Sequence, residues 1–268
     1  MLEIFQYEFM QNAILASVLA SIACGIIGTY IVIKRLVFLS GGISHSAYGG
    51  IGLGYLLSFN PIYGAVFSSL LGAVFVSVMR KNKLENEDTL IGIIWAFGMA
   101  LGVLFIGLSP GYAPDLMSYL FGNILTVSIN ELILMGIADL IIMVVVAIFF
   151  KQFQAITFDE EYSKTIGLNV DFYYLLLFVL IALTLVLLIK LVGIILVVAL
   201  LTIPAAISKM IAKSLKSMMF LSIIFGLVFT ILGLLISYYL NLPSGSAIII
   251  LSVIGYFIVF ITNKILNN

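Results

Sequence analysis

The residue with the clearest potential for chemistry is the single histidine, His45. Imidazole titrates near neutral pH and is a common ligand for divalent metal ions. On a helix, the positions three and four residues away lie beside it, and Gly41, Gly42 and Gly49 at these positions lack a side chain. The ring therefore stands beside open space or beside a closely approaching helix.

Two interpretations of His45 remain open on the residues alone. In one, the glycines form a helix-packing face and the imidazole makes a hydrogen bond between helices. In the other, His45 and the neighbouring Ser44 line a pathway, and a ring nitrogen binds a passing metal ion. One histidine does not make a metal site, so further ligands must be sought.

A second candidate is Asp139, near the middle of the apolar run 129–150. A carboxylate at this depth is costly in lipid and should face the interior of a helix bundle. It is a candidate cation ligand, or alternatively a partner for a tyrosine or serine hydroxyl. The single cysteine, Cys24, excludes a disulfide framework and a cysteine-rich metal site.

The elements that position these residues must be membrane helices. Hydrophobic residues make up 63% of the 268-residue chain and charged residues only 9%, whereas soluble domains carry roughly 25% charged residues. A soluble fold cannot hide so much apolar surface, and no segment alternates as a membrane barrel would. The zero net charge gives no indication of nucleic-acid binding. We predict an all-α integral membrane protein, formed by one helical bundle over residues 1–268.

Crossing the hydrocarbon layer takes about 20 apolar residues, and nine segments qualify. They are 13–33, 41–58, 61–79, 89–108, 129–150, 172–190, 191–208, 217–240 and 245–263. The segments on either side of residue 191 abut, so they could form one long or broken helix and leave eight spans. With the N-terminus outside, every lysine and arginine except Lys190 falls on the cytoplasmic side, as the positive-inside rule expects.

Two loops are long enough to be informative. The loop 109–128 has no lysine or arginine and is predicted to be external, with room for a short helix or a re-entrant segment. The loop 151–171 is predicted to be cytoplasmic. Within it, Asp159 can cap a short helix that ends at Gly167. The first turn of this helix carries the acids Glu160 and Glu161.

Pro204 lies within the predicted span 191–208. Proline has no backbone donor, so we expect it to kink this helix and to free backbone carbonyls. Such a kink can line a cavity or serve the structure alone.

Four groups of residues follow one another along the chain at a characteristic spacing. They are Gly28–Arg35 with Ile43–Ala47; Asp115–Gly122; Phe158–Glu161 with Ile166–Leu168, Val192–Gly193 and Val197–Ala206; and Ser237–Gly245. Together they resemble the membrane permease of the metal-ion ABC importers, the family that carries zinc, manganese or iron into prokaryotic cells.

The resemblance implies a homodimeric permease similar to the type II ABC importer permeases, in the cytoplasmic (inner) membrane of a prokaryote. It implies two cytoplasmic ATPase subunits and an extracytoplasmic metal-binding protein as partners. It also implies that the loop 158–168, with Asp159, Glu160, Glu161 and Gly167, supplies the coupling helix that docks on the ATPase. The chain has no glycine-rich phosphate loop with lysine and serine or threonine. It is therefore expected to be no enzyme and to bind no cofactor, with a divalent ion as its cargo.

The resemblance also indicates an ion route, and this chain differs from the family at two positions on it. The route is expected to pass His45 and to be lined by Gly41, Gly42, Ser44, Gly49, Thr202, Pro204 and Asn241. Zinc and manganese members usually carry an aspartate four residues before this histidine, where this chain has Gly41, and many carry an aspartate at the position of Asn241. Both differences remove negative charge from the route and weaken its attraction for a cation. Asp139 is our candidate substitute.

Three functions remain to be separated. The first is a permease subunit that imports divalent metal ions by alternating access, with weak binding near His45 so that the ion is released. The second is a permease for a larger metal chelate such as a siderophore, favoured by the missing acid and by a path that glycines would widen. The third is an intramembrane enzyme using His45 and Asp139, for which the sequence has no nucleophile motif.

Overall fold

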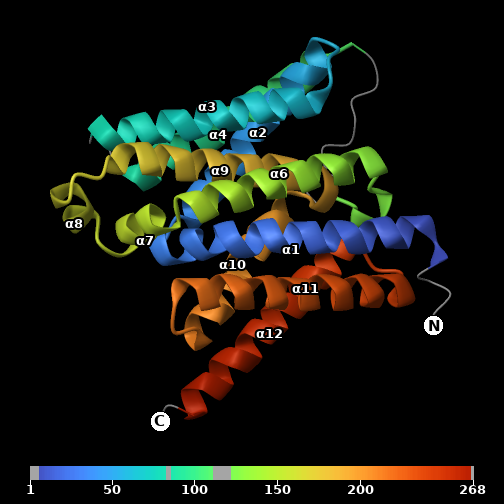
Figure 1. Cartoon of the computed structure of the whole chain (residues 1–268). Coiled ribbons are helices and arrows are strands. Elements are labelled where there is room, and N and C mark those ends of the chain that lie inside the picture. Colours follow the sequence, from blue (N-terminus) through green and yellow to red (C-terminus); the bar gives the residue numbers. More distant parts are fainter. Residues whose placement is uncertain (1–5, 83–85, 111–121, 267–268) are drawn as a thin grey trace. The chain divides into compact units, whose positions relative to one another are not determined.

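The computed structural model describes residues 6–82, 86–110 and 122–266, and in this part of the chain the regular elements are all helices, without strands (Figure 1). The prediction of an all-α protein is confirmed. The chain packs as two compact units, which are described separately. Unit 1 comprises Met1–Lys34, Met117–Val145 and Leu187–Asn268, and unit 2 comprises Arg35–Leu116 and Val146–Val186. Each unit gathers segments that lie far apart in the sequence, so they are not consecutive domains.

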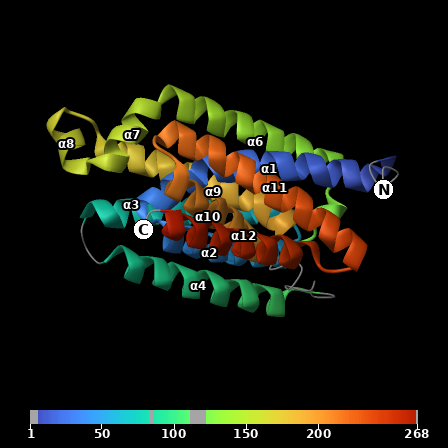
Figure 2. The same ribbon diagram turned by 90° about the horizontal axis from the view of Figure 1, so that it is seen from below.

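Unit 1 is built around its first helix. Its elements are α1 (Glu8–Lys34), the 3-10 turn η2 (Ile124–Thr126), most of α6 (Ile129–Ile148), the end of α9 (Val170–Val192), α10 (Ile194–Ile211), α11 (Leu215–Leu240) and α12 (Ser244–Leu266). Helix α1 packs on α10 and α11, which also pack on each other and on α12. Helix α6 runs beside α1 (Figures 1 and 2). Small residues allow the close approach, since Gly28 faces the backbone of Leu201 and the hydroxyls of Ser21 and Thr230 lie 3.5 Å apart.

The division between α9 and α10 falls at Gly193. Its φ of 80° lies in the left-handed region, where glycine has no steric penalty. The backbone of Val192 and Gly193 also lies directly against Gly122, which leaves no space for a β-carbon there. The two abutting spans of the sequence are therefore two helices and not one, as the count of nine segments requires.

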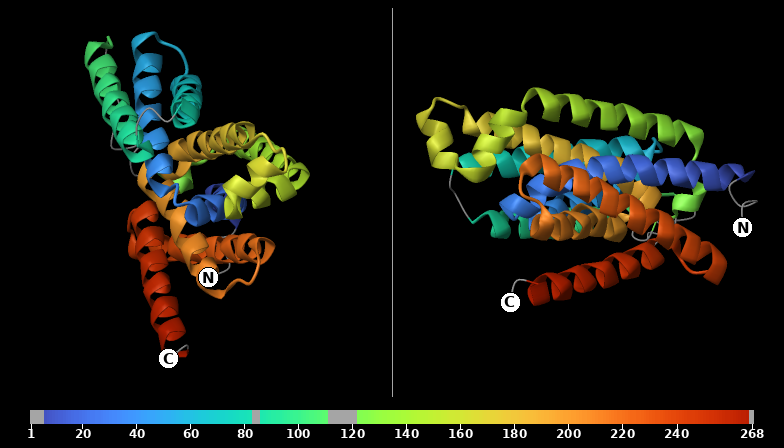
Figure 3. Two further views of the ribbon diagram at one scale, coloured as in Figure 1. Left: turned by 90° about the vertical axis from the view of Figure 1, so that its left-hand side faces the viewer. Right: turned by 60° about the horizontal axis from the view of Figure 1, so that its bottom comes forward.

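Unit 2 is centred on the helix that carries His45. Its elements are α2 (Val37–Leu56), α3 (Pro61–Asn82), α4 (Glu87–Leu108), the short α7 (Phe150–Phe158) and α8 (Glu160–Thr165), and the first part of α9. Helix α2 packs extensively on both α3 and α4, whereas α3 and α4 make few direct contacts with each other. Figure 3 shows α3 and α4 on either side of α2.

Glycines bring the backbone of α2 into contact with both neighbours. Gly50 lies against the backbone of Gly64 on α3, and a β-carbon on either glycine would overlap the other residue. On the opposite side, a β-carbon on Gly52 would lie 2.6 Å from the carbonyl oxygen of Gly102 on α4. The register of α2 against both neighbours is thus fixed by positions that tolerate no side chain.

Each predicted span coincides with one long helix. Eight of these helices are long and apolar enough to cross a membrane: α1, α3, α4, α6, α9, α10, α11 and α12. Helix α2 is not among them, because its sequence is rich in glycine and serine. Protein on two sides of α2 supplies the contacts that such a helix does not obtain from lipid. Most of the predicted external loop 109–128 lies outside the described residues.

The packing of α2 predicts a graded response to alanine. We expect Gly50→Ala to destabilise the protein by about 1–3 kcal/mol, because the new methyl group meets the Gly64 backbone. Gly92→Ala on α4 is the matched control, since its β-carbon meets no atom within 4 Å and alanine favours the helix. Thermal unfolding of the detergent-purified protein measures both changes. Equal Tm values for the two variants would contradict this packing.

Candidate functional site

The imidazole of His45 is half-buried on α2, and one of its nitrogens is fixed. Nδ1 lies 2.8 Å from the carbonyl oxygen of Gly41. A carbonyl only accepts, so Nδ1 carries the hydrogen, and in the neutral ring the lone pair is on Nε2. No described residue makes a hydrogen bond with Nε2. Histidines that ligate metals are commonly held in this way, with the other nitrogen bonded to a carbonyl or carboxylate.

The face of the imidazole is covered by Trp95 of α4. The two rings are stacked, with centroids 4.0 Å apart and planes inclined by 19°. The ring of Phe38 in turn packs on the indole, with ring centroids 5.8 Å apart. His45 thus stands beside a closely approaching helix and not beside open space, and its ring is held by both the Gly41 carbonyl and the indole.

The other residues predicted around His45 serve the packing of α2. Gly42 lies against Ile91, and Gly49 lies against the backbone of Gly98. Ser44 is fully buried and donates to a carbonyl one turn earlier, at 2.8 Å. Their role in lining an ion route stays a prediction.

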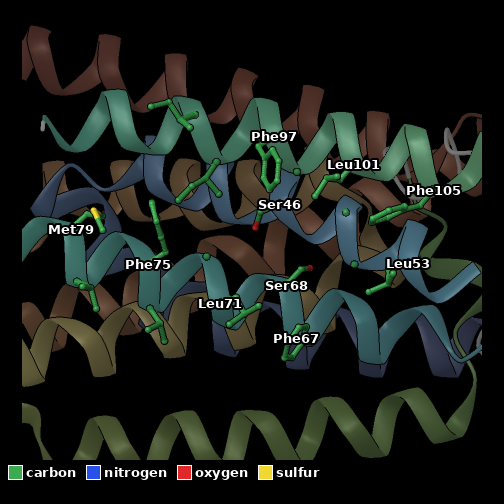
Figure 4. A pocket seen from close by; sticks show the side chains of 18 residues that line it. Ser46, Leu53, Phe67, Ser68, Leu71, Phe75, Met79, Phe97, Leu101 and Phe105 are labelled. Carbon is green, nitrogen blue, oxygen red and sulfur yellow. The ribbon is translucent and has the colours of Figure 1, made fainter. Parts of the chain in front are cut away.

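An apolar groove opens between α3 and α4, with α2 as its floor (Figure 4). Leu71 and Phe75 line one wall and Phe97 the other, while Ser46 and Ser68 supply the only polar side chains. Both hydroxyls donate to carbonyls of their own helices, at 2.7 and 3.2 Å. The residues that line the groove include no charged side chain.

Asp139 is buried inside unit 1. Its side chain is 4% exposed, and Oδ2 has no hydrogen-bond partner among the described residues. The carboxyl lies near Cys24 of the neighbouring α1. The prediction that it faces the protein interior is confirmed. Within the described ranges, no three or more histidine, cysteine, aspartate or glutamate side chains are grouped so as to hold a metal ion, so neither His45 nor Asp139 belongs to such a group.

Three further predicted route residues lie in unit 1. Thr202 donates to the carbonyl of Val198 at 2.8 Å, and Pro204 is buried within α10. Asn241 ends α11 in the left-handed conformation, with φ 50° and ψ 44°. Asparagine is favoured there after glycine, a backbone role that reasoning from charge alone missed.

The predicted helix in the loop 151–171 is confirmed at both ends. The Asp159 carboxylate accepts from the backbone N–H of Tyr162 at 2.8 Å and caps α8. At the other end, Gly167 has φ 83°, and its N–H and that of Leu168 bond back to the last turn at 3.1 and 3.0 Å. These two bonds form a Schellman motif.

Glu160 ties α8 to two longer helices. Its Oε2 accepts from Arg80 of α3 at 2.8 Å and from the Tyr174 hydroxyl of α9 at 3.2 Å, and Oε1 accepts from Lys164 at 3.2 Å. The Arg80 guanidinium also lies 3.5 Å above the Tyr174 ring. Burial alone would raise the pKa of Glu160, but the two cations and the hydroxyl outweigh it, so the pKa is lowered. Sequence reasoning missed this cluster, because Arg80 and Glu160 are far apart along the chain.

Three large apolar side chains are exposed around α8. Phe158, Tyr162 and Ile166 are 66%, 59% and 52% exposed, and they recur every four residues. Exposed apolar groups beside charges are typical of surfaces that bind other proteins. Phe158 and Ile166 are among the residues that carry the family resemblance, but the sequence alone did not predict that their side chains and that of Tyr162 are exposed together.

Comparison with known proteins decides the family. Residues 6–263 match the ABC 3 transport family. The chain belongs to this family. It is 49% identical over 258 residues to an uncharacterized membrane protein of Synechocystis sp., which covers 96% of this chain and 92% of that protein.

Two further relatives have informative names. Over 258 residues, the chain is 35% identical to the manganese transport system membrane protein MntC of Listeria monocytogenes, covering 96% of this chain and 92% of MntC. A solved structure of PsaBC from Streptococcus pneumoniae in complex with Fab matches with a TM-score of 0.86 at 35% identity, over 97% of this chain and 94% of that chain. The resemblance and the fold class predicted from the sequence are confirmed.

The Glu160 cluster predicts a pH-dependent α8. Because its pKa is lowered on folding, Glu160 stabilises the contact above its ordinary value of 4.5, and this contribution is lost as the pH falls through the folded value. We expect amide-exchange protection of α8, corrected for intrinsic rates, to fall between pH 7 and pH 3. Glu160→Gln should lower protection at pH 7 and flatten this response, whereas Glu161→Gln, at an exposed position, should behave like the unmodified protein. An unchanged response in Glu160→Gln would contradict the assignment.

Proposed function

We propose that the chain is the membrane permease subunit of an ABC importer for divalent metal ions, with zinc and manganese as the first candidates and iron as a third. Membership of the ABC 3 transport family and the names of MntC and PsaBC support this proposal. The observation that carries it is the geometry of His45, whose Nδ1 is fixed on Gly41 and whose Nε2 has no partner in the described chain.

A single neutral nitrogen suits a transit contact. An imidazole binds divalent transition metals, and one such ligand binds them weakly enough to release them. We propose that the permease is a homodimer, so that a second copy brings a second His45. The carboxyl of Asp139, which is buried and lacks a hydrogen bond at Oδ2, is proposed as the negative charge that compensates the ion along the route.

Energy for import is proposed to come from cytoplasmic ATPase subunits that dock on α8. The exposed side chains of Phe158, Tyr162 and Ile166 offer an apolar contact, and the exposed Glu161 adds charge at its edge. An extracytoplasmic metal-binding protein would deliver the ion from the other side of the prokaryotic inner membrane. Binding, alternating access and release then belong to the permease, and hydrolysis belongs to its partner.

Both alternatives lose support. The chelate hypothesis relied on the missing acid at Gly41 and on glycines that widen the path beside His45. The second ground is lost, because Gly42 and Gly49 are in contact with α4. Membership of a transport family favours a permease over an intramembrane enzyme.

Uptake by proteoliposomes tests the ion contacts. With the ATPase partner reconstituted, we expect His45→Ala to lower uptake of Zn²⁺ and Mn²⁺ at least tenfold, since even the loss of a residue that only supports a metal ligand typically costs about 10–100-fold in affinity or activity. Asp139→Asn should slow uptake of the same ions, whereas Asp88→Asn, at an exposed position, is the control and should not. Unchanged uptake by His45→Ala would contradict the proposal that His45 contacts the ion. Unchanged uptake by Asp139→Asn would contradict the proposal that Asp139 compensates the charge of the ion.

Co-purification tests the docking surface. We expect Tyr162→Ala and Ile166→Ser each to weaken binding of the ATPase subunit about tenfold, as loss of a central apolar contact does at protein interfaces. Tyr63→Ala is the control, because Tyr63 is 70% exposed on α3 and belongs to no proposed contact. If all three variants retain the ATPase equally, α8 is not the docking element.

A further inference from the structure

The geometry points to Trp95 as a residue that determines which ions the site accepts. We infer that its indole both holds the His45 imidazole by stacking and occupies the space that a side chain at position 41 would need. The site then presents an imidazole nitrogen without a carboxylate beside it. This inference rests on the proposed role of His45 as the ion contact.

The indole has little freedom to leave this position. One turn before it on α4, Ile91 lies against Gly42, and one turn after it Gly98 lies against the backbone of Ser46, so α2 and α4 are in register on both sides of Trp95. Between these two contacts, the ring centroid of the indole lies 4.0 Å from that of the imidazole and 5.8 Å from that of Phe38. The stack is therefore a consequence of helix packing, and it sets the direction of the imidazole plane.

The edge of the indole lies against position 41 and crowds any side chain placed there. A β-carbon on Gly41 would lie 3.1, 3.6 and 3.8 Å from Cζ3, Cη2 and Cε3 of Trp95, all on the six-membered ring. Position 41 is one helical turn before His45, the place from which a second side chain could share an ion with the imidazole. A side chain longer than a methyl group could follow this direction only by displacing the indole from its stack with His45.

Ion selectivity follows from the ligand that remains. Imidazole suits Zn²⁺ and related transition metals, whereas carboxylates favour Mn²⁺, Mg²⁺ and Ca²⁺. When an ion binds Nε2, the imidazole becomes electron-poor, and the electron-rich face of the indole stabilises it as in a cation–π contact. The site should therefore bind Zn²⁺ more tightly than Mn²⁺ and should reject Mg²⁺ and Ca²⁺.

Trp95 is the only tryptophan of the chain, so its fluorescence reports directly on this site. In the full-length protein, purified without a histidine tag, we expect Zn²⁺ to change the emission at lower concentration than Mn²⁺, and Mg²⁺ to have no effect. The change should be absent in His45→Ala. A response that persists in His45→Ala, together with unchanged Zn²⁺ binding in dialysis, would overturn the proposed ion contact itself.

Equilibrium dialysis of Zn²⁺ and Mn²⁺ tests the role of Trp95 separately. We expect Trp95→Ala to weaken Zn²⁺ binding about three- to tenfold and Trp95→Phe, which keeps an aromatic face, to weaken it less. Gly41→Asp alone should destabilise the protein and gain little Mn²⁺ affinity. Gly41→Asp combined with Trp95→Ala should bind Mn²⁺ at least tenfold more tightly than either single variant, because the carboxylate then has room beside His45.

Three outcomes would overturn the inference and leave the His45 contact intact. One is unchanged Zn²⁺ affinity in Trp95→Ala while His45→Ala loses it. Another is a Mn²⁺ affinity of Gly41→Asp equal to that of the double variant. The third outcome applies if Trp95→Ala does not fold. In that case, a Zn²⁺ affinity of Trp95→Phe equal to that of the unmodified protein would show that the indole does not support the imidazole. A raised Mn²⁺ affinity of Gly41→Asp would show that the indole does not exclude a side chain at position 41.

Discussion

The contact of the α2 backbone with α3 and α4 is the constraint on which the position of His45 depends. The hydrocarbon core of a membrane forms no hydrogen bonds and solvates glycine- and serine-rich helices poorly, so such a helix needs protein around it. Gly50 against Gly64 and Gly52 against Gly102 bring the helices to backbone contact. This register places the imidazole against Trp95.

Contacts within unit 2 also connect the proposed docking element to the ion contact. Helix α8 is joined to α3 through Glu160 and Arg80, and α3 packs along α2, the helix of His45. Under the proposed function, a movement that the ATPase imposes on α8 reaches α2 through one charged contact and one glycine-lined interface. Both are short-range interactions, which transmit displacement better than a flexible loop would.

Local rules explain what the sequence could predict. Apolar runs of membrane length predicted the long helices, and Asp159 and Gly167 predicted the ends of α8. The cost of a carboxylate in an apolar run predicted that Asp139 is buried in the protein. The stack of His45 on Trp95 and the bond from Arg80 to Glu160 could not be found in this way. They join residues distant in sequence, and nothing local to either partner selects the other. Asn241 shows a different limit, because its amide was interpreted as a missing charge while its backbone conformation is what ends α11.

The central claim is that the imidazole of His45 is a ligand of the transported ion, and X-ray absorption spectroscopy tests it most directly. The chain has one histidine, so any imidazole scattering around Zn²⁺ bound to the purified protein, prepared with a histidine-free tag, comes from His45. If His45 binds the ion, an imidazole nitrogen lies at about 2.0–2.1 Å from the zinc and its signal disappears in His45→Ala. A zinc shell without imidazole scattering in the unmodified protein would contradict the claim.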